Sequence, residues 1–366
     1  MTRGGDQTVR RANPARDSSR RFIERHPRSI LLGWILLFLC LLLVAAEVLL
    51  RYTISYRIDY YTGTRVSNNL VKYPFGDMPF NSNGYTDREW DKADPRIRVG
   101  FWGDSITMGF GAGFGYRYTD IISDTRQDKY YMNFGGAGAD GIADDRVIEK
   151  LVELVQRYRL KKVVYAMDLN DILPDKGAPE ARHSELYKAR PLIKRYVDIL
   201  RSRSYVYNYF RLKLRNAAVR MGYGYKGDEA FELHPARNAV IVSETVERIN
   251  KLWVSLKRRE VDLCVALFPY EMQISADAAA HYQQDGVRWS GELLRGEPQK
   301  TILGQLSPGI GAVDLTPAFR RSRDNPIRVG EYFVFNQGDA LDWVHPNRNG
   351  HRLIAEYLLS NAASCL

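Results

Sequence analysis

The chain of 366 residues is long enough to bury the core of one large domain or of two small ones. Its formal net charge of +10 is uneven, because residues 1–28 carry +5, residues 182–226 carry +10, and the remainder carries −5. This distribution excludes a protein that binds nucleic acid over its whole surface.

The first apolar segment covers residues 30–46 without a charge. It predicts a transmembrane signal anchor over residues 29–50, because the stretch is long for a cleaved leader and lacks a small-residue cleavage site. A cleaved leader or a buried helix is the alternative. The Arg-rich residues 1–28 are expected to be disordered and to lie in the cytoplasm. The residues after the anchor are then expected to lie on the outer side of a bacterial inner membrane. Residues 51–96 are then a juxtamembrane arm.

Beyond the arm, short apolar runs alternate with amphipathic ones, which is typical of a parallel sheet covered by helices. We therefore predict a doubly wound α/β domain over residues 97–366, with ligands bound at the carboxyl ends of its strands. The alternation breaks over about 172–236, a basic, Tyr-rich insertion. The expected strands are Arg98–Trp102, Lys129–Phe134, Lys162–Met167, Val261–Phe268 and Ala312–Leu315, and the expected helices cover residues 142–158, 236–260 and 349–361.

A serine follows the first expected strand, in the sequence FWGDSITMGFGAG. Taken alone, Ser105 would be a helix cap or a turn residue. A second glycine-rich stretch, Gly136–Gly141, has the spacing of a dinucleotide-binding fingerprint. We reject that interpretation because three carboxylates, those of Asp140, Asp144 and Asp145, would repel a pyrophosphate there.

Four motifs occur in one order at strand ends or before a helix: GDS at 103–105, NFGGAG at 133–138, DLND at 168–171 and DWVH at 342–345. The ordered set resembles the SGNH (GDSL-type) hydrolases over roughly residues 81–361. The lead-in NSNGYTDREW is similar to a segment of envelope-polysaccharide members of that family. The resemblance implies a membrane-anchored, envelope-polysaccharide-associated member.

The resemblance implies a role for each motif. Ser105 is the expected nucleophile, His345 its general base, and Asp342 the carboxylate that orients the imidazole. The expected oxyanion donors are the Ser105 N–H, the Gly138 N–H and the Asn170 side chain. The implied reaction needs no metal or organic cofactor, and His183, His234 and His281 are scattered without metal-ligand spacing.

One residue departs from the pattern. Asp168 stands where the third motif usually has glycine, and a carboxylate aimed at the oxyanion would oppose catalysis. We therefore expect Asp168 to turn away or to be neutralised. The neighbouring Asp104 and Asp171 are candidate substrate contacts, although bonding loop backbone is their commoner role.

The insertion carries four further candidate substrate contacts, Arg201, Arg203, Arg211 and Arg215. Its cations and tyrosines suit an anionic glycan or lipid headgroups, and equally a solvated helical face. Among the cysteines, Cys40 lies in the apolar segment. Cys264 is expected to be a small buried hydrophobe, with a disulfide to Cys365 left open.

These patterns predict a serine-dependent ester hydrolase acting outside the cytoplasm, on ester groups of a cell-envelope glycan. One alternative is an O-acyltransferase that modifies such a glycan with the help of a multi-span membrane partner that delivers acyl groups. The other is an inactive domain that binds polysaccharide or export machinery. A single-pass membrane attachment and a glycan or other acyl ester are the expected partners, and nucleic acid is not.

Overall fold

The structure is a computed structural model of the whole chain. It describes residues 27–53, 64–67, 70–73, 75–136, 141–142, 145–172, 196–197, 199–200, 203–221, 235–278, 291–320, 327–328, 330–336 and 340–366. The chain divides into two compact units, one of Met1–Ser55 with Ser204–Val206 and one of Tyr56–Arg203 with Tyr207–Leu366.

The first unit contains α2 (Pro27–Thr53), a helix of 27 residues whose most apolar window has a mean hydropathy of 2.8. Its length and composition are sufficient to cross a membrane. Glu47, near its end, accepts hydrogen bonds from the N–H groups of Tyr205 and Val206, at 2.9 and 3.0 Å. These groups belong to the start of α8 (Tyr205–Arg220), so a carboxylate satisfies donors that a helix leaves open at its first turn.

The second unit is built on a five-stranded parallel sheet in the order β5-β4-β6-β7-β8. This is the flavodoxin-like order, in which the second strand lies on one side of the first and the later strands are added on its other side. The predicted α/β class and all five predicted strands are confirmed. The bounds are β4 (Ile97–Gly103), β5 (Lys129–Asn133), β6 (Leu160–Met167), β7 (Asp262–Leu267) and β8 (Gly311–Asp314).

Helices cover both faces of this sheet, and the side chains of β4, β5, β6 and β7 alternate between two cores. On β6, Val163 and Met167 belong to one core cluster, whereas Val164 belongs to the other. Each fully buried aliphatic side chain contributes about 1.5–3 kcal/mol relative to its exposed state. The first core also contains residues of α5 (Asp145–Tyr158), α9 (Pro235–Lys257) and α11 (Glu297–Gln305).

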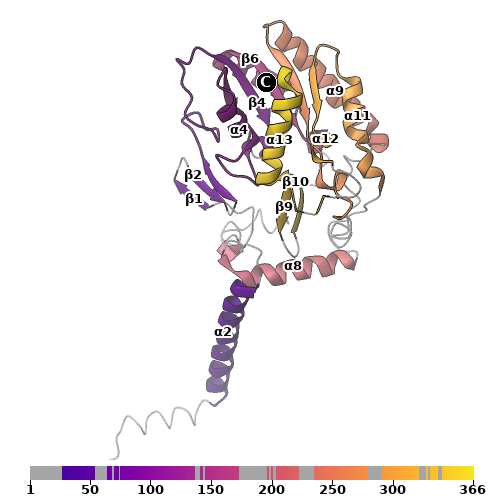
Figure 1. Cartoon of the computed structure of the whole chain (residues 1–366). Helices are drawn as coiled ribbons and strands as arrows, with labels where there is room; N and C mark the ends of the chain where they lie inside the picture. Colours follow the sequence, from indigo (N-terminus) through magenta and orange to yellow (C-terminus); the bar gives the residue numbers. More distant parts are fainter. Residues whose placement is uncertain are drawn as a thin grey trace, which may run out of the picture. The chain divides into compact units, whose positions relative to one another are not determined.

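The second core is covered by α4 (Tyr118–Thr125), α12 (Thr316–Phe319) and α13 (Arg348–Asn361). Figure 1 shows α4 and α13 side by side in front of the sheet. Because crossover helices on opposite faces leave the strand ends clear, the carboxyl edge of the sheet is where side chains from several strands can meet.

Two smaller sheets complete the unit. The first is antiparallel and contains β1 (Thr64–Ser67), β2 (Leu70–Tyr73) and β3 (Gly76–Pro79). Beside it, Phe75 and Met78 pack with Met108 and Phe110 in a third core cluster, so part of the expected arm contributes to the domain's core. The second is the hairpin of β9 (Phe333–Asn336) and β10 (Ala340–Pro346). Besides α12, the described residues contain the short helices α3 (Ser105–Met108), η1 (Leu169–Ile172), η3 (Glu271–Gln273), η4 (Gly291–Arg295) and η5 (Ala363–Cys365).

A disulfide joins Cys264 of β7 to Cys365 of η5, with Cα atoms 5.4 Å apart across a separation of 101 residues. Both cysteines are buried. Cys264 is therefore buried, as expected, but it is not a free thiol, because the disulfide to Cys365 that the sequence left open is present. The sequence signal was weak because the two residues are brought together only by the packing of the C-terminal segment against the sheet.

Candidate active site

Ser105 lies at the turn between β4 and α3. Asp104 caps this turn, and its Oδ1 accepts the Ile106 N–H at 2.9 Å. Ser105 is the first residue of α3, so its own N–H precedes the hydrogen bonds that the helix makes internally. Gly103 is required just before it, because a β-carbon there would overlap Thr107 Oγ1 and the Ala166 carbonyl oxygen.

His345 and Asp342 reach the serine from β10. The Ser105 Oγ lies 2.7 Å from His345 Nε2, and His345 Nδ1 lies 2.6 Å from Asp342 Oδ2. Asp342 Oδ1 accepts the N–H groups of Val344 and His345, at 3.0 Å each. The carboxylate is thus held by two backbone donors with its second oxygen directed at the imidazole. Three residues from two distant parts of the sequence form one continuous hydrogen-bonded chain.

Two opposing effects act on the pKa of His345. Burial disfavours the imidazolium, but the charge and hydrogen bond of Asp342, together with the charge of Asp104, outweigh it and raise the pKa. The His345 side chain is 18% exposed and that of Asp342 is 5% exposed, so their attraction is poorly screened by water. This environment favours a histidine that can accept a proton and hold it as an imidazolium.

The third motif lies at the end of the neighbouring strand. In the β4–β6 register Gly103 pairs with Ala166, so Ser105 and Asp168 follow equivalent positions of adjacent strands. Asn170 is exposed, whereas Asp168 is buried. Asp168 Oδ1 accepts the Asn170 N–H at 2.9 Å, and its Oδ2 accepts from Asn170 Nδ2 at 3.0 Å.

Asp168 also lies close enough to Asp104 and Asp171 for their charges to act on it. Burial, followed by the charges of Asp104 and Asp171, raises the pKa of Asp168 well above its usual range. The expectation that this carboxyl must be neutralised therefore has a physical basis.

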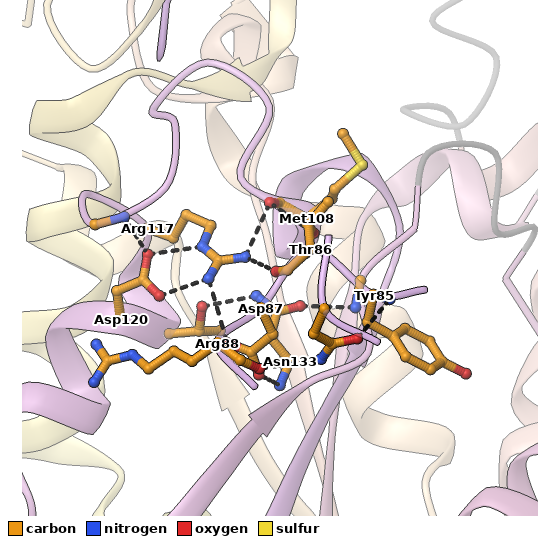
Figure 2. A network of polar contacts seen from close by, with 12 residues as sticks. Tyr85, Thr86, Asp87, Arg88, Met108, Arg117, Asp120 and Asn133 are labelled. Atoms are coloured by element: carbon orange, nitrogen blue, oxygen red, sulfur yellow. Dashed lines mark hydrogen bonds and ion pairs between the residues drawn. The ribbon is translucent and has the colours of Figure 1, made fainter. Parts of the chain in front are cut away.

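Figure 2 shows a network of polar contacts around Arg117, which reaches Met108, the last residue of α3. Arg117 is fully buried and donates from Nε and Nη2 to the Asp120 carboxylate, at 2.7 and 2.6 Å. Its Nη1 donates to the carbonyl oxygens of Thr86 and Met108, and its Nη2 lies 3.5 Å from Asp87 Oδ1. Removing one partner from such a buried pair costs about 3–5 kcal/mol, so this network fixes the end of α3.

The network continues into the second motif through Asn133. The Asn133 N–H donates to Asp87 Oδ2 at 2.8 Å, and its Nδ2 donates to the Thr107 carbonyl at 2.7 Å. Its Oδ1 accepts the Gly135 N–H at 2.8 Å. Gly135 itself packs so closely on α3 that a β-carbon would overlap the Met108 backbone. The lead-in motif and the second motif therefore hold α3, which begins with Ser105, in place through these contacts.

The structure describes some of the remaining predicted site residues and not others. Gly138 and Arg201 lie outside the described residues, as does the side chain of Arg215. Arg203 is exposed and Arg211 is partly buried on α8. Asp104 and Asp171 are both buried, and Asp171 Oδ2 accepts the Tyr165 hydroxyl at 2.9 Å, so both make bonds inside the domain. In the described part of the chain, no cluster of His, Cys, Asp and Glu could hold a metal ion.

Sequence reasoning did not identify two residues that support the site. Phe110 packs against His345 with ring centres 5.0 Å apart. Arg117 donates to Asp120 and to the Met108 carbonyl at the end of α3. Phe110 lies within the glycine-rich stretch that follows the serine, so its position was a usable signal. Arg117 had no such signal, because apart from Asp120 its partners Thr86, Asp87 and Met108 come from other segments of the chain.

No protein-family model and no curated protein matches the chain. Solved structures similar to it include an acetyl xylan esterase, AlAXEase, at 16% identity, covering 72% of this chain and 98% of that chain with a TM-score of 0.37. A catalytic mutant of Axe2, an acetylxylan esterase from Geobacillus stearothermophilus, is also 16% identical, covering 74% of this chain and 95% of that chain with a TM-score of 0.38. A member of the lipolytic protein G-D-S-L family from Veillonella parvula is 12% identical, covering 73% of this chain and 98% of that chain with a TM-score of 0.37. At these identities and TM-scores, only the geometry of the site itself bears on the activity of this chain.

Proposed function

We propose that the α/β domain is a serine-dependent acyl-ester hydrolase. The observation that carries this proposal is the hydrogen-bonded chain from Asp342 through His345 to Ser105, at 2.6 and 2.7 Å. A serine hydroxyl is a weak nucleophile, and a base within hydrogen-bond reach is what makes it reactive. The base must in turn be held in the tautomer that leaves Nε2 free to accept, which the Asp342 contact to Nδ1 does.

The proposed reaction has two halves. Ser105 Oγ attacks the ester carbonyl while His345 Nε2 takes the hydroxyl proton, and the imidazolium then gives that proton to the departing alcohol oxygen as the acyl–oxygen bond breaks. Water next attacks the acyl-enzyme, again losing its proton to His345, and the acid leaves as Ser105 recovers its hydrogen. Each half passes through an oxyanion, which the Ser105 N–H, the Gly138 N–H and the Asn170 side-chain amide would stabilise.

We infer that the domain works outside the cytoplasm. The Cys264–Cys365 disulfide supports this location, because disulfides persist mainly in oxidising compartments. The basic residues 1–28 before α2 favour a cytoplasmic N-terminus and an inner-membrane, single-pass topology. A tethered esterase meets polymers at the membrane surface at high effective concentration, so ester groups of a cell-envelope glycan are the substrate we favour.

An O-acyltransferase is the second candidate, favoured by the same tether. The acyl-enzyme is identical in both reactions, and a sugar hydroxyl would replace water in the second half. One membrane helix cannot carry an acyl donor across a bilayer, so transfer requires a multi-span partner that supplies the acyl group. Hydrolysis needs no partner, and we place it first.

The two candidate reactions predict opposite changes in the ester content of the cell's surface polysaccharide. We expect Ser105→Ala, introduced in the source organism, to change the ester content of its surface polysaccharide. An increase indicates a deacylase and a decrease indicates a transferase. Unchanged content of every envelope ester would overturn the glycan assignment.

A further inference from the structure

Helix α8 carries a row of exposed apolar side chains. Phe210 is 57% exposed, Leu214 is 69% exposed and Met221 is 68% exposed. With the exposed Ala217 they recur at the spacing of one helix face, which we call the α8 apolar face. The Met221 N–H donates to the Ala217 carbonyl at 3.0 Å, so the face continues through the last turn. An exposed apolar face of this kind marks an interaction site.

The other side of α8 is buried. Asn208 is buried and Arg211 is partly buried. These residues lie about 160° and about 100° around the helix axis from Phe210. The exposure of the α8 apolar face is therefore specific to one side of the helix.

The charge of α8 has a single sign. Residues 205–220 contain four cations and no carboxylate, the cations being Arg211, Lys213, Arg215 and Arg220. Lys213 is exposed beside the α8 apolar face, and its Nζ lies 5.7 Å from the centre of the Tyr209 ring. A lysine at such an edge lays its alkyl stem on apolar surface while its ammonium reaches polar headgroups. An exposed apolar face bordered by cations is typical of helices that lie on an anionic lipid surface.

The first turn of α8 is bound to the end of α2. Glu47 accepts the Ser204 hydroxyl at 3.0 Å. It also accepts the N–H groups of Tyr205 and Val206, at 2.9 and 3.0 Å. Arg51, one turn later on α2, lies 3.1 Å from Glu47 and 5.5 Å from the centre of the Tyr205 ring. All of these residues belong to the same compact unit.

The position of Glu47 on α2 sets the depth of this junction. The uncharged residues 30–46 precede it, and a helix of that length rises about 26 Å. The hydrocarbon core of a bilayer is about 30 Å thick. A carboxylate is costly within hydrocarbon, so Glu47 favours the outer boundary of the core. Because it binds the first turn of α8, that helix begins at the membrane surface.

We propose that α8 is an interfacial helix, with its apolar face inserted among the lipids of the outer leaflet and its cations at anionic headgroups. This inference rests on the single-pass topology proposed above, and not on the reactivity of Ser105. Residues after Val206 belong to the same unit as the α/β domain. An interfacial α8 thus gives the domain a second attachment to the membrane besides α2.

The test places an environment-sensitive dye on the α8 apolar face of the full-length protein, at Ala217→Cys. Cys40→Ser removes the free cysteine, since Cys264 and Cys365 form the disulfide. In vesicles of phosphatidylcholine and phosphatidylglycerol, the dye emission should shift to shorter wavelength. A nitroxide near the headgroup end of the lipid acyl chain should quench it. The same dye at Lys251→Cys, an exposed position of α9, is the matched control and should show neither effect.

A double substitution tests whether the apolar side chains cause the insertion. Phe210→Ser combined with Leu214→Ser removes apolar area without changing the charge, so the dye at Ala217→Cys should lose most of its quenching. Val240→Ser, which alters another exposed aliphatic side chain, should leave the quenching unchanged. Omitting phosphatidylglycerol should weaken the quenching, because the cations lose their anionic partners. Full quenching in the double variant would overturn the proposal.

An alkaline wash of the vesicles separates the two levels of the account. Protein that stays in the vesicles but shows no quenching of the Ala217→Cys dye would overturn the role of α8 and leave the topology standing. A dye shielded from water but not quenched by the lipid nitroxide would show that a protein surface, such as a second copy, covers the face, and would also overturn the proposal. Protein released by the wash would overturn the topology and this inference together.

Discussion

Replacing Asp342 by Asn tests the geometry of the candidate triad most sharply. In the wild type, Asp342 Oδ1 accepts two backbone N–H groups and Oδ2 accepts from the imidazole. Asparagine has one oxygen, which the two backbone donors require, so its amide nitrogen must face His345 Nδ1. An amide N–H can only donate, so Nδ1 becomes the acceptor and the ring hydrogen moves to Nε2. His345 then cannot accept the proton of Ser105.

The expected loss in kcat is about 10³–10⁴-fold, equivalent to about 4–5.5 kcal/mol of activation free energy. Binding of a small ester does not involve Asp342, so KM should change little. The assay is hydrolysis of 4-nitrophenyl acetate by full-length protein in detergent, with thermal unfolding as the check on folding. Asp314→Asn, which alters a carboxylate at the end of another strand, is the matched control and should keep wild-type kcat. An Asp342→Asn protein with more than about a tenth of wild-type kcat would refute the argument.

The pH profile of the wild type belongs to the same prediction. His345 must be neutral to act as a base, and its pKa is raised above its usual value of 6.5. The kcat/KM should therefore rise with pH through a midpoint above 6.5, because the free enzyme becomes competent only as His345 loses its proton. A midpoint below that value would show that Asp342 and Asp104 do not stabilise the imidazolium.

Three further outcomes are expected. Cys365→Ser should lower the free energy of unfolding in urea by about 4 kcal/mol, because the disulfide closes a long loop, and an unchanged value would contradict the pairing. His351 is buried and its Nδ1 accepts the Tyr118 N–H at 3.2 Å, and burial lowers its pKa to about 3. Between about pH 6.5 and 3 the His351 side chain is therefore protonated in the unfolded chain and neutral in the folded chain, which lowers the free energy of unfolding by up to about 1.4 kcal/mol per pH unit as the pH falls. His351→Asn removes this contribution, so its free energy of unfolding should fall less steeply between pH 6.5 and 3. Equal slopes in both proteins would contradict this. Changing the four insertion arginines to Glu should weaken salt-dependent binding to anionic vesicles or acidic glycan, whereas unchanged binding would leave them as a solvated face.

The sheet was predictable from sequence because each of its strands is a short apolar run. Runs such as Leu160–Met167 are buried on both faces and bounded by polar residues, so period and length identify them without any tertiary information. The helix of residues 145–158 was equally readable, since its apolar residues lie on one face. The local sequence pattern was therefore sufficient to predict these strands and this helix.

The parts that were not predicted depend on contacts between distant residues. The sequence placed Asp342 and His345 before the last helix, but not in a strand paired with Phe333–Asn336. The placement of Ser105 and Asp168 at the ends of adjacent strands depends on the pairing of β4 with β6, which no local pattern encodes. Burial of Arg117 likewise depends on residues from three other segments, so its role appears only in the folded chain.

The measurement that tests the central claim most directly is acylation of Ser105 by a fluorophosphonate probe. Full-length protein in detergent would be incubated with the probe, digested and examined by mass spectrometry for the modified residue. A serine activated by His345 should be labelled at Ser105, and labelling should disappear in Ser105→Ala and fall strongly in His345→Ala. A folded wild-type protein that binds glycan but leaves Ser105 unlabelled would contradict the enzyme assignment and favour an inactive binding domain.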